Sequence, residues 1–295
     1  MATHFKVLQQ GDRRWLSVEG PWEPRLADLM RDQGLSELRV FADGRNGAAR
    51  IDYLGEIPFL QRLGLCIVGL RDVSPLYDLP NLRALTVQRI ERKIDFTRIP
   101  RLENLSLSWN AKLFSSLLES ERLEVLGIDN FTGKDFLPFA KLKALENIGF
   151  AFTRLESFAG LEQFPELGRL SLGPINRLET LDHLEGYPDL RYLQVEAAKK
   201  LRRIDAVSRL RCLQELWFTA CPQIESLRAI EGLPALEYFG LLQTTSVADG
   251  DLSALLKLPR LKHASIRDRK HHNMKNDNLP KAYRKTNKLI TLQKG

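Results

Sequence analysis

The sequence contains few cysteines and no long apolar segment. Three cysteines in 295 residues do not form a disulfide framework. No run of 18 consecutive apolar residues is present, so we expect no membrane-spanning helix. The first residues, MATHFKVLQQGDRR, contain no apolar run that could act as a signal peptide. These features together predict a cytoplasmic protein.

Sequence motifs for catalysis are also missing. The loop FADGRNGAARID has two glycines but lacks the Lys-Ser/Thr ending of a P-loop, and the chain has neither a Gly-rich dinucleotide loop nor a nucleophile elbow. His263, His271 and His272 are clustered, but no Cys or carboxylate accompanies them at the spacing of metal ligands. We therefore expect a non-enzyme without cofactor, metal or small-molecule substrate.

One pattern, L-x-x-L-x-Φ with Φ apolar, recurs along most of the chain. It is clearest in the stretch 164–195, where two copies lie 23 residues apart, and the spacing elsewhere is 20 to 25 residues. The leading leucines are Leu35, Leu60, Leu82, Leu102, Leu123, Leu145, Leu167, Leu190, Leu213, Leu236 and Leu261. Such spacing predicts a unit made of a short strand, a turn and a loose helical turn.

Proline supports the same division into units. Seven of the 14 prolines lie two positions before a leading leucine. Proline cannot continue a helix and favours extended geometry in the residue before it. It therefore marks the point where the outer turn ends and the strand begins.

These units resemble leucine-rich repeats, in particular the short-repeat subclass of phosphatase regulators and internalin-type adhesins. The resemblance covers residues 35–269. It implies an α/β leucine-rich-repeat solenoid, or horseshoe, with about eleven parallel strands on the concave face. Loops, 3-10 helices or short helices would form the convex face.

The family pattern expects Asn, Cys or Thr eight positions after the leading leucine, where a buried polar side chain satisfies backbone groups of the turn. Asn110, Thr153, Cys221 and Thr244 match this expectation. Five other repeats carry an apolar residue there, namely Val68, Ile90, Phe131, Ile175 and Ala198.

Three regions follow from the pattern. Residues 1–34 read as a hairpin plus a short helix, which would cap the first repeat; residues 35–269 are the repeats; and residues 270–295 form a basic tail or C-terminal cap. Residues 257–295 contain 12 of the 44 Lys and Arg but only two of the 37 Asp and Glu. The rest of the chain therefore has a formal charge of −3, and the whole net charge of +7 comes from this last segment.

Alternation along each strand predicts which side chains leave the core. Positions two, four and six after the leading leucine should point onto the concave face. In the eighth to tenth repeats these positions carry Tyr192, Gln194, Glu196, Glu215, Trp217, Thr219 and Tyr238. We predict a partner-binding surface there, with a weaker second one around Trp109 and Phe152. The alternative is that the aromatic rings pack on one another and only stiffen the sheet.

The sequence favours a non-catalytic protein–protein interaction module, such as an adaptor, an enzyme regulator or an immunity-type inhibitor, which binds a protein partner on its concave face. The alternative is a nucleic-acid- or ribosome-associated protein that uses its basic tail. A competing interpretation is that the tail is only solvated, because it contains a single aromatic residue and no platform on which bases could stack.

Overall fold

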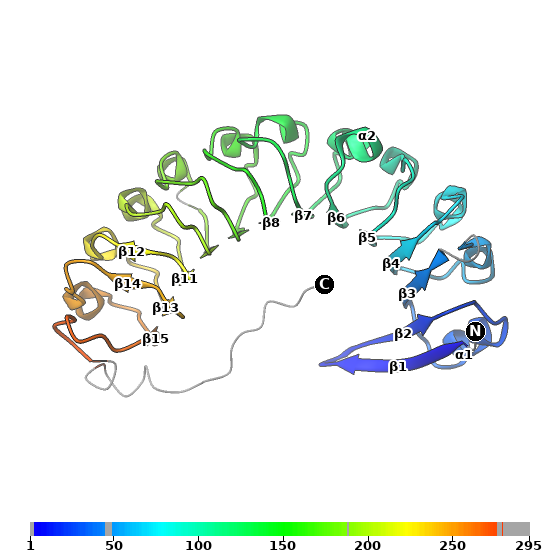
Figure 1. Cartoon of the computed structure of the whole chain (residues 1–295), viewed down its shortest axis with the longest axis horizontal. Helices are drawn as coiled ribbons and strands as arrows, with labels where there is room; N and C mark the ends of the chain where they lie inside the picture. Colours follow the sequence, from blue (N-terminus) through cyan, green and yellow to red (C-terminus); the bar gives the residue numbers. More distant parts are fainter. Residues whose placement is uncertain (1–2, 45–48, 188, 276–278, 280–295) are drawn as a thin grey trace. The chain divides into compact units, whose positions relative to one another are not determined.

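The computed structural model describes residues 3–44, 49–187, 189–275 and 279. The chain forms two compact units, residues 1–127 and 128–294. In each unit short strands lie along one side and helical turns along the other (Figure 1).

Fifteen strands are present in the described residues, thirteen of them in the main sheet order and two in a small separate pair. Their bounds are β1 His4–Gln10, β2 Arg13–Glu19, β3 Glu37–Asp43, β4 Arg62–Val68, β5 Ala84–Gln88, β6 Asn104–Ser108, β7 Val125–Asp129, β8 Asn147–Ala151, β9 Arg169–Leu172, β10 Tyr192–Glu196, β11 Glu215–Thr219, β12 Gln223–Ile224, β13 Tyr238–Leu242, β14 Ser246–Val247 and β15 His263–Ile266.

The helices are short. The α-helices are α1 Arg25–Asp32 and α2 Ala111–Phe114. The 3-10 helices within the described residues are Asp52–Glu56, Ser74–Asp78, Phe96–Arg98, Ser115–Glu119, Leu137–Phe139, Leu161–Gln163, Leu184–Gly186, Asp205–Arg209, Arg228–Ile230 and Ser253–Lys257.

Each of the eleven repeats contributes one strand at the predicted place. In the first unit the strand order is β1-β2-β3-β4-β5-β6, and in the second it is β8-β9-β10-β11-β13-β15, while β7 contains the boundary. Neighbouring strands are parallel in the registers resolved, except that β1 pairs with β2 antiparallel. The predicted parallel, repeat-by-repeat architecture is confirmed.

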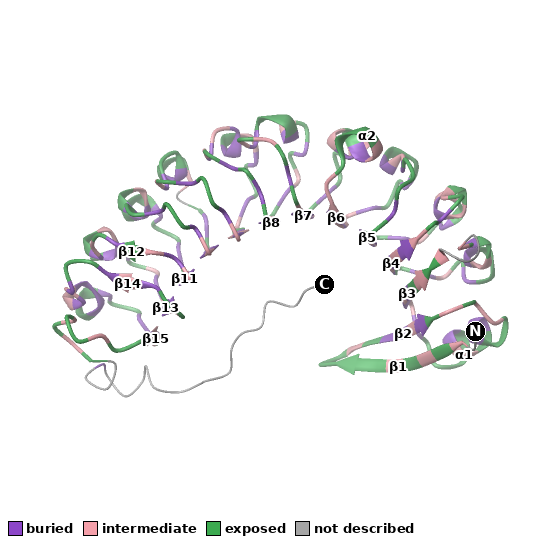
Figure 2. Cartoon of the chain, viewed as in Figure 1, coloured by how far each residue is buried: buried purple, intermediate pink, exposed green. Residues whose placement is uncertain are grey.

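The leucines of the repeat form the core. Leu170, Leu193 and Leu216 face one another in register and are completely buried, and Leu105 and Leu126 are buried in the first unit. Figure 2 shows alternating buried and more exposed positions along the strands. A parallel sheet stacked in this way buries its apolar side chains between successive repeats.

Five phenylalanines enlarge this core in the second unit. The ring of Phe150 lies 5.3 Å from that of Phe136, and 5.4 Å from those of Phe131 and Phe139. Phe158 stacks on Phe136 at 6.3 Å. Aromatic side chains bury large areas and favour such offset and tilted pairs. All five side chains are buried.

Local hydrogen bonds determine where several outer turns begin. The carboxylates of Asp95, Asp135 and Asp251 each accept a hydrogen bond from the backbone N–H two residues later. A side chain of this type satisfies one of the free N–H groups at the start of a helix. The following residues then close only one or two 3-10 turns before the next strand.

The strands end in a recurrent left-handed residue. Seven positions after the leading leucine, φ is positive in six repeats, at Arg89, Asn130, Phe152, Ala197, Ala220 and Gln243. This conformation is costly for a residue with a Cβ. It reverses the chain away from the sheet.

The buried polar positions agree with the expected pattern only in part. The hydroxyl of Thr153 and the thiol of Cys221 are buried and bond to nearby backbone groups, whereas Asn110 is exposed and caps α2. The expectation for Thr244 is wrong, because Thr244 is exposed and Thr245 is buried in its place. A tight turn, in which the N–H of Thr245 donates to the carbonyl oxygen of Leu242, directs residue 245 inward.

At the N-terminal end, β1 and β2 precede α1, whose Leu26 and Met30 are buried. The division of the chain into cap, repeats and tail stays a prediction. Most of the basic tail, residues 276–278 and 280–295, lies outside the described residues. Over the residues described, none of the helices combines the length and the apolar character required to cross a bilayer.

Candidate functional site

The predicted surface lies on three adjacent strands of the second unit. The pairing of β10 with β11 and of β11 with β13 sets Tyr192, Glu215 and Tyr238 side by side in one row. In the next row Gln194, Trp217 and Gly240 are neighbours. We call the face of β10, β11 and β13 turned away from the core the aromatic face.

Trp217 is held at the centre of this face. Its indole Nε1 donates to a carboxylate oxygen of Glu215 at 3.2 Å. Its ring lies over Gly240, so closely that a Cβ at residue 240 would collide with Cε3 and Cζ3 of the ring. Only glycine permits this approach. Trp217 as a whole is partly accessible.

The structure corrects the prediction that Tyr192 is exposed. Only 4% of this residue is accessible, because the guanidinium of Arg169 lies 3.9 Å from the centre of its ring. The Tyr192 hydroxyl donates to Oε1 of Gln194 at 2.5 Å. Burial, against the opposing charge of Arg169, raises the pKa of Tyr192 to about 12. The hydroxyl therefore stays protonated and acts as a donor at neutral pH.

Thr219 is also buried, contrary to the prediction. It is the last residue of β11, next to the left-handed turn at Ala220, and its carbonyl oxygen accepts from the N–H of Ala197. The remaining predicted residues, Gln194, Glu196, Glu215, Trp217 and Tyr238, are all partly accessible.

The second, weaker surface was expected around Trp109 and Phe152. Trp109 follows β6 in the first unit and is partly accessible. Phe152 follows β8 in the second unit, is 61% exposed and adopts a left-handed conformation with φ of 53°. The two residues belong to different compact units.

Two of the clustered histidines lie close together. His271 and His272 lie 4.7 Å apart, and Nε2 of His271 is 2.8 Å from the carbonyl oxygen of Val247. Burial lowers the pKa of His272, with the charges of His271 and Arg269 acting in the same direction. Within the described ranges, no three His, Cys, Asp or Glu side chains are placed to hold a metal ion.

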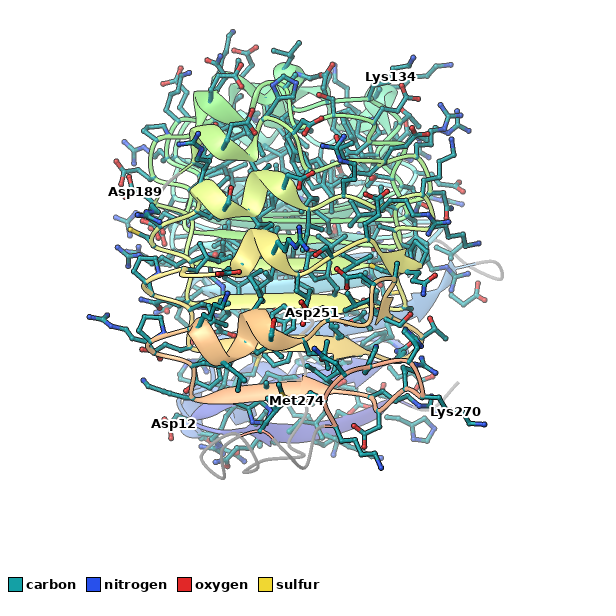
Figure 3. All side chains as sticks on the ribbon, turned by 90° about the vertical axis from the view of Figure 1, so that its left-hand side faces the viewer. Asp12, Lys134, Asp189, Asp251, Lys270 and Met274 are labelled. Atoms are coloured by element: carbon teal, nitrogen blue, oxygen red, sulfur yellow. The ribbon has the colours of Figure 1, made fainter. Side chains whose placement is uncertain are left out.

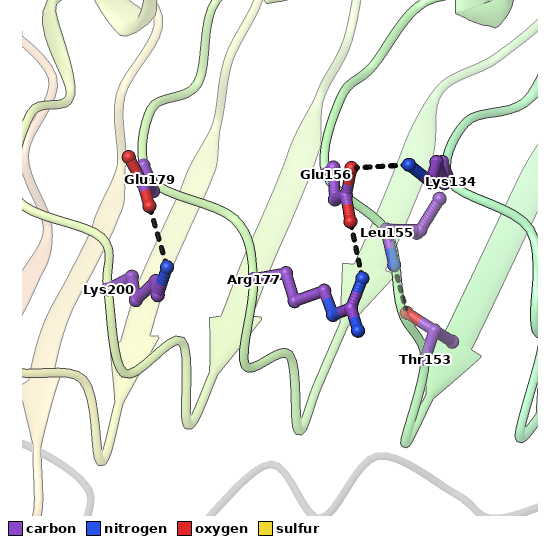
Figure 4. A network of polar contacts seen from close by, with 7 residues as sticks. All are labelled: Lys134, Thr153, Leu155, Glu156, Arg177, Glu179 and Lys200. Carbon is purple, nitrogen blue, oxygen red and sulfur yellow. Dashed lines mark hydrogen bonds and ion pairs between the residues drawn. The ribbon is translucent and has the colours of Figure 1, made fainter.

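A row of ion pairs, which sequence reasoning missed, follows one edge of the second unit (Figure 4). Glu156 bridges Lys134 and Arg177, and Glu179 pairs with Lys200. The hydrogen bond from Arg177 is the main reason that the pKa of Glu156 is lowered. The signal was available in the sequence, because opposite charges occur ten to twelve residues after the leading leucine in successive repeats.

This charged edge is a poorer candidate for a binding site than the aromatic face. A hollow of about 400 Å³ is lined by Glu156, Arg177, Glu179, Thr180 and Lys200. Its charges already pair with one another and are exposed, which makes each pair worth little. Lys134 and Asp189 illustrate how charged side chains project to solvent around this unit (Figure 3). The aromatic face offers larger, more rigid groups.

Comparison with known proteins supports the fold. The chain matches no family model and no curated protein sequence. Among solved structures it is similar to an internalin, InlF, from Listeria monocytogenes, with 22% identity and a TM-score of 0.58, covering 83% of this chain and 70% of that one. The fold is a leucine-rich-repeat solenoid.

Two further leucine-rich-repeat comparisons agree. A leucine-rich-repeat protein from Leptospira interrogans shares 18% identity at a TM-score of 0.53, over 83% of this chain and 69% of its own. The PEPR1–AtPEP1 structure shares 16% identity at a TM-score of 0.51, over 87% of this chain and 41% of that one. At these identities the similarity concerns the fold alone.

Proposed function

We propose that this leucine-rich-repeat protein is a non-catalytic interaction module that binds a protein partner through the aromatic face. The observation that carries the proposal is the fixed position of Trp217. Its ring is packed on Gly240 and its N–H is bonded to Glu215, so little conformational entropy is lost on binding.

The surroundings of Trp217 have the composition of a protein interface. Tyr238 supplies a second partly accessible aromatic ring, and Gln194, Glu196 and Glu215 supply polar groups around it. Tyr and Trp dominate interface energetics because they bury a large area with few rotatable bonds. A structure of similar fold, PEPR1–AtPEP1, names two molecules together, which agrees with a binding role.

Site-specific photocrosslinking in cells tests this proposal. A p-benzoyl-phenylalanine at Ser171, on the strand next to the aromatic face, should capture one specific protein. The same group at Ser208, on the exposed 3-10 helix Asp205–Arg209, is the matched control and should not capture it. Equal capture at both positions would contradict the proposal.

The captured protein is then purified and titrated. The double variant Trp217→Ala, Tyr238→Ala should weaken its binding by at least about 2 kcal/mol, or roughly thirtyfold. Leu256→Ala is the control, because Leu256 is 59% exposed on the outer 3-10 helix Ser253–Lys257. An unchanged affinity of the double variant would remove the aromatic face from the interaction.

A further inference from the structure

We infer that the partner places an arginine side chain on the accessible side of the Trp217 ring, with its guanidinium paired to Glu215. This inference rests on the proposed function and specifies its chemistry. Trp217 carries a planar aromatic ring and is partly accessible, and the carboxylate beside it already orients the ring. A flat, charged donor group can use both features at once.

The same chain contains this arrangement in completed form. In the first unit, the guanidinium of Arg39 lies 4.3 Å from the centre of the Trp15 ring. Nε of Arg39 donates to Glu37 at 3.1 Å. Glu37 and Arg39 occupy the second and fourth positions after their leading leucine, which are the positions of Glu215 and Trp217 in their own repeat.

A second internal example lies beside the proposed site. The guanidinium of Arg169 lies 3.9 Å from the centre of the Tyr192 ring. Tyr192 is the register neighbour of Glu215 on the preceding strand. Arginine on an aromatic ring is therefore a contact that this sheet face supports at close range. Such contacts gain strength when the groups are partly shielded from water.

The site at Trp217 contains the tryptophan and the carboxylate, but it has no cation of its own in the described part of the chain. Cε3 and Cζ3 of its ring lie close to Gly240, and no Lys or Arg among the described residues stacks on the ring. Likewise, no ion pair to Glu215 is found among those residues. Nearby cations are used elsewhere, since Arg169 covers Tyr192 and Lys262 pairs with Glu237.

Arginine suits this geometry better than lysine. The guanidinium is planar, so it stacks on the indole while its edge N–H groups donate to a carboxylate. The lysine ammonium is a compact, strongly hydrated charge and loses more solvation at such a site. The inference thus commits to an arginine-bearing segment of a protein partner.

Short peptides test this directly, without the natural partner. The probe is acetyl-Gly-Gly-Arg-Gly-Gly-amide, compared with its lysine and citrulline versions. Citrulline keeps the shape of arginine but carries no charge. The readout is the indole N–H resonance of Trp217, one of four tryptophans, assigned through Trp217→Phe. We expect this resonance to shift in proportion to the concentration of the arginine peptide, with a slope about three- to tenfold larger than with the other two peptides.

Variants of the full chain separate the two contacts. Glu215→Gln should weaken the binding of the arginine peptide severalfold and leave the binding of the citrulline peptide nearly unchanged. Gly240→Ala should displace the ring and abolish the arginine preference. Gly149→Ala is the matched control, because a Cβ at residue 149 meets open space.

The outcomes are distinguishable from those of the photocrosslinking experiment. Equal binding of the arginine and citrulline peptides, or a shift confined to another tryptophan, overturns the arginine inference. Should the captured partner still need Trp217 but be indifferent to Glu215→Gln, the aromatic face remains the interface and the arginine contact is wrong.

Discussion

A single buried hydroxyl links two repeats near Thr245. Only 1% of this residue is accessible. Its Oγ1 accepts from the N–H of Cys221 at 3.0 Å and donates to the carbonyl oxygen of Phe218 at 3.2 Å. Both partners belong to the preceding repeat, so the hydroxyl fastens one turn to the next.

Thr245→Val should therefore destabilise the protein by about 1–3 kcal/mol, because it leaves two buried backbone groups without a partner. Urea unfolding measures the effect as a lower midpoint at unchanged slope. Thr244→Val is the matched control, since Thr244 is exposed, and should change stability by less than about 0.5 kcal/mol. Equal effects of the two substitutions would contradict this role.

Counting positions along the sequence did not predict the burial of every single residue. It assigned the buried hydroxyl to Thr244, because the turn following Leu242 could not be foreseen. It also predicted an exposed Tyr192. Alternation gave the correct face of β10, but not the Arg169 side chain that covers the ring from the strand before. The signal was present, since Arg169 and Tyr192 both lie two residues after a leading leucine.

The outer turns show how backbone geometry connects neighbouring repeats. Gly160 precedes the 3-10 helix Leu161–Gln163 with φ of 91°, and His183 holds the same left-handed conformation before Leu184–Gly186. The two positions differ in their surroundings. A Cβ at residue 160 would collide with the backbone of Phe136 and Leu137 in the previous repeat.

Gly160→Ala should consequently cost about 2–4 kcal/mol, from the left-handed backbone and from the displacement of the adjacent repeat. The midpoint of urea unfolding reports this loss. Gly186→Ala serves as the control, because a Cβ there meets nothing within 4 Å, and should be close to neutral. If both variants unfold at the same urea concentration, close packing at Gly160 does not hold these repeats together.

The strands were the most predictable elements, and the outer turns the least. Each strand follows a strict alternation and a leading leucine, so all eleven were placed correctly. The turns depend on capping carboxylates such as Asp95 and on left-handed residues such as Phe152, which a hydrophobic pattern does not reveal. The ion pairs at Glu156 join residues about 20 positions apart, and they follow from the repeat spacing of the charges rather than from the hydrophobic pattern.

Charge is distributed unevenly over the whole molecule. Residues 1–256 carry a formal charge of −3, and the remaining segment carries +10. The described part of that segment is attached to the preceding repeat, because Asn273 bonds to Leu252 and Asp251. A truncation after residue 275 therefore keeps these contacts.

The nucleic-acid hypothesis predicts that the full chain retains RNA or duplex DNA at low salt and that a chain lacking residues 276–295 does not. The deleted stretch contains five Lys and Arg. Neutralising about five phosphates gives a slope of about −4 for the logarithm of the affinity against the logarithm of salt concentration. Filter binding at several salt concentrations measures it. Equal retention by both chains would refute a role for the tail.

The parallel registers have a mechanical consequence. From β3 onward, the strands of the main sheet pair with strands about one repeat away in the chain, as Leu193 does in register with Leu170 and Leu216. Tension applied at the two ends would thus load the contacts in series. Each coil that gave way would release roughly 70 Å of extended polypeptide, so the molecule would lengthen in small steps under modest force.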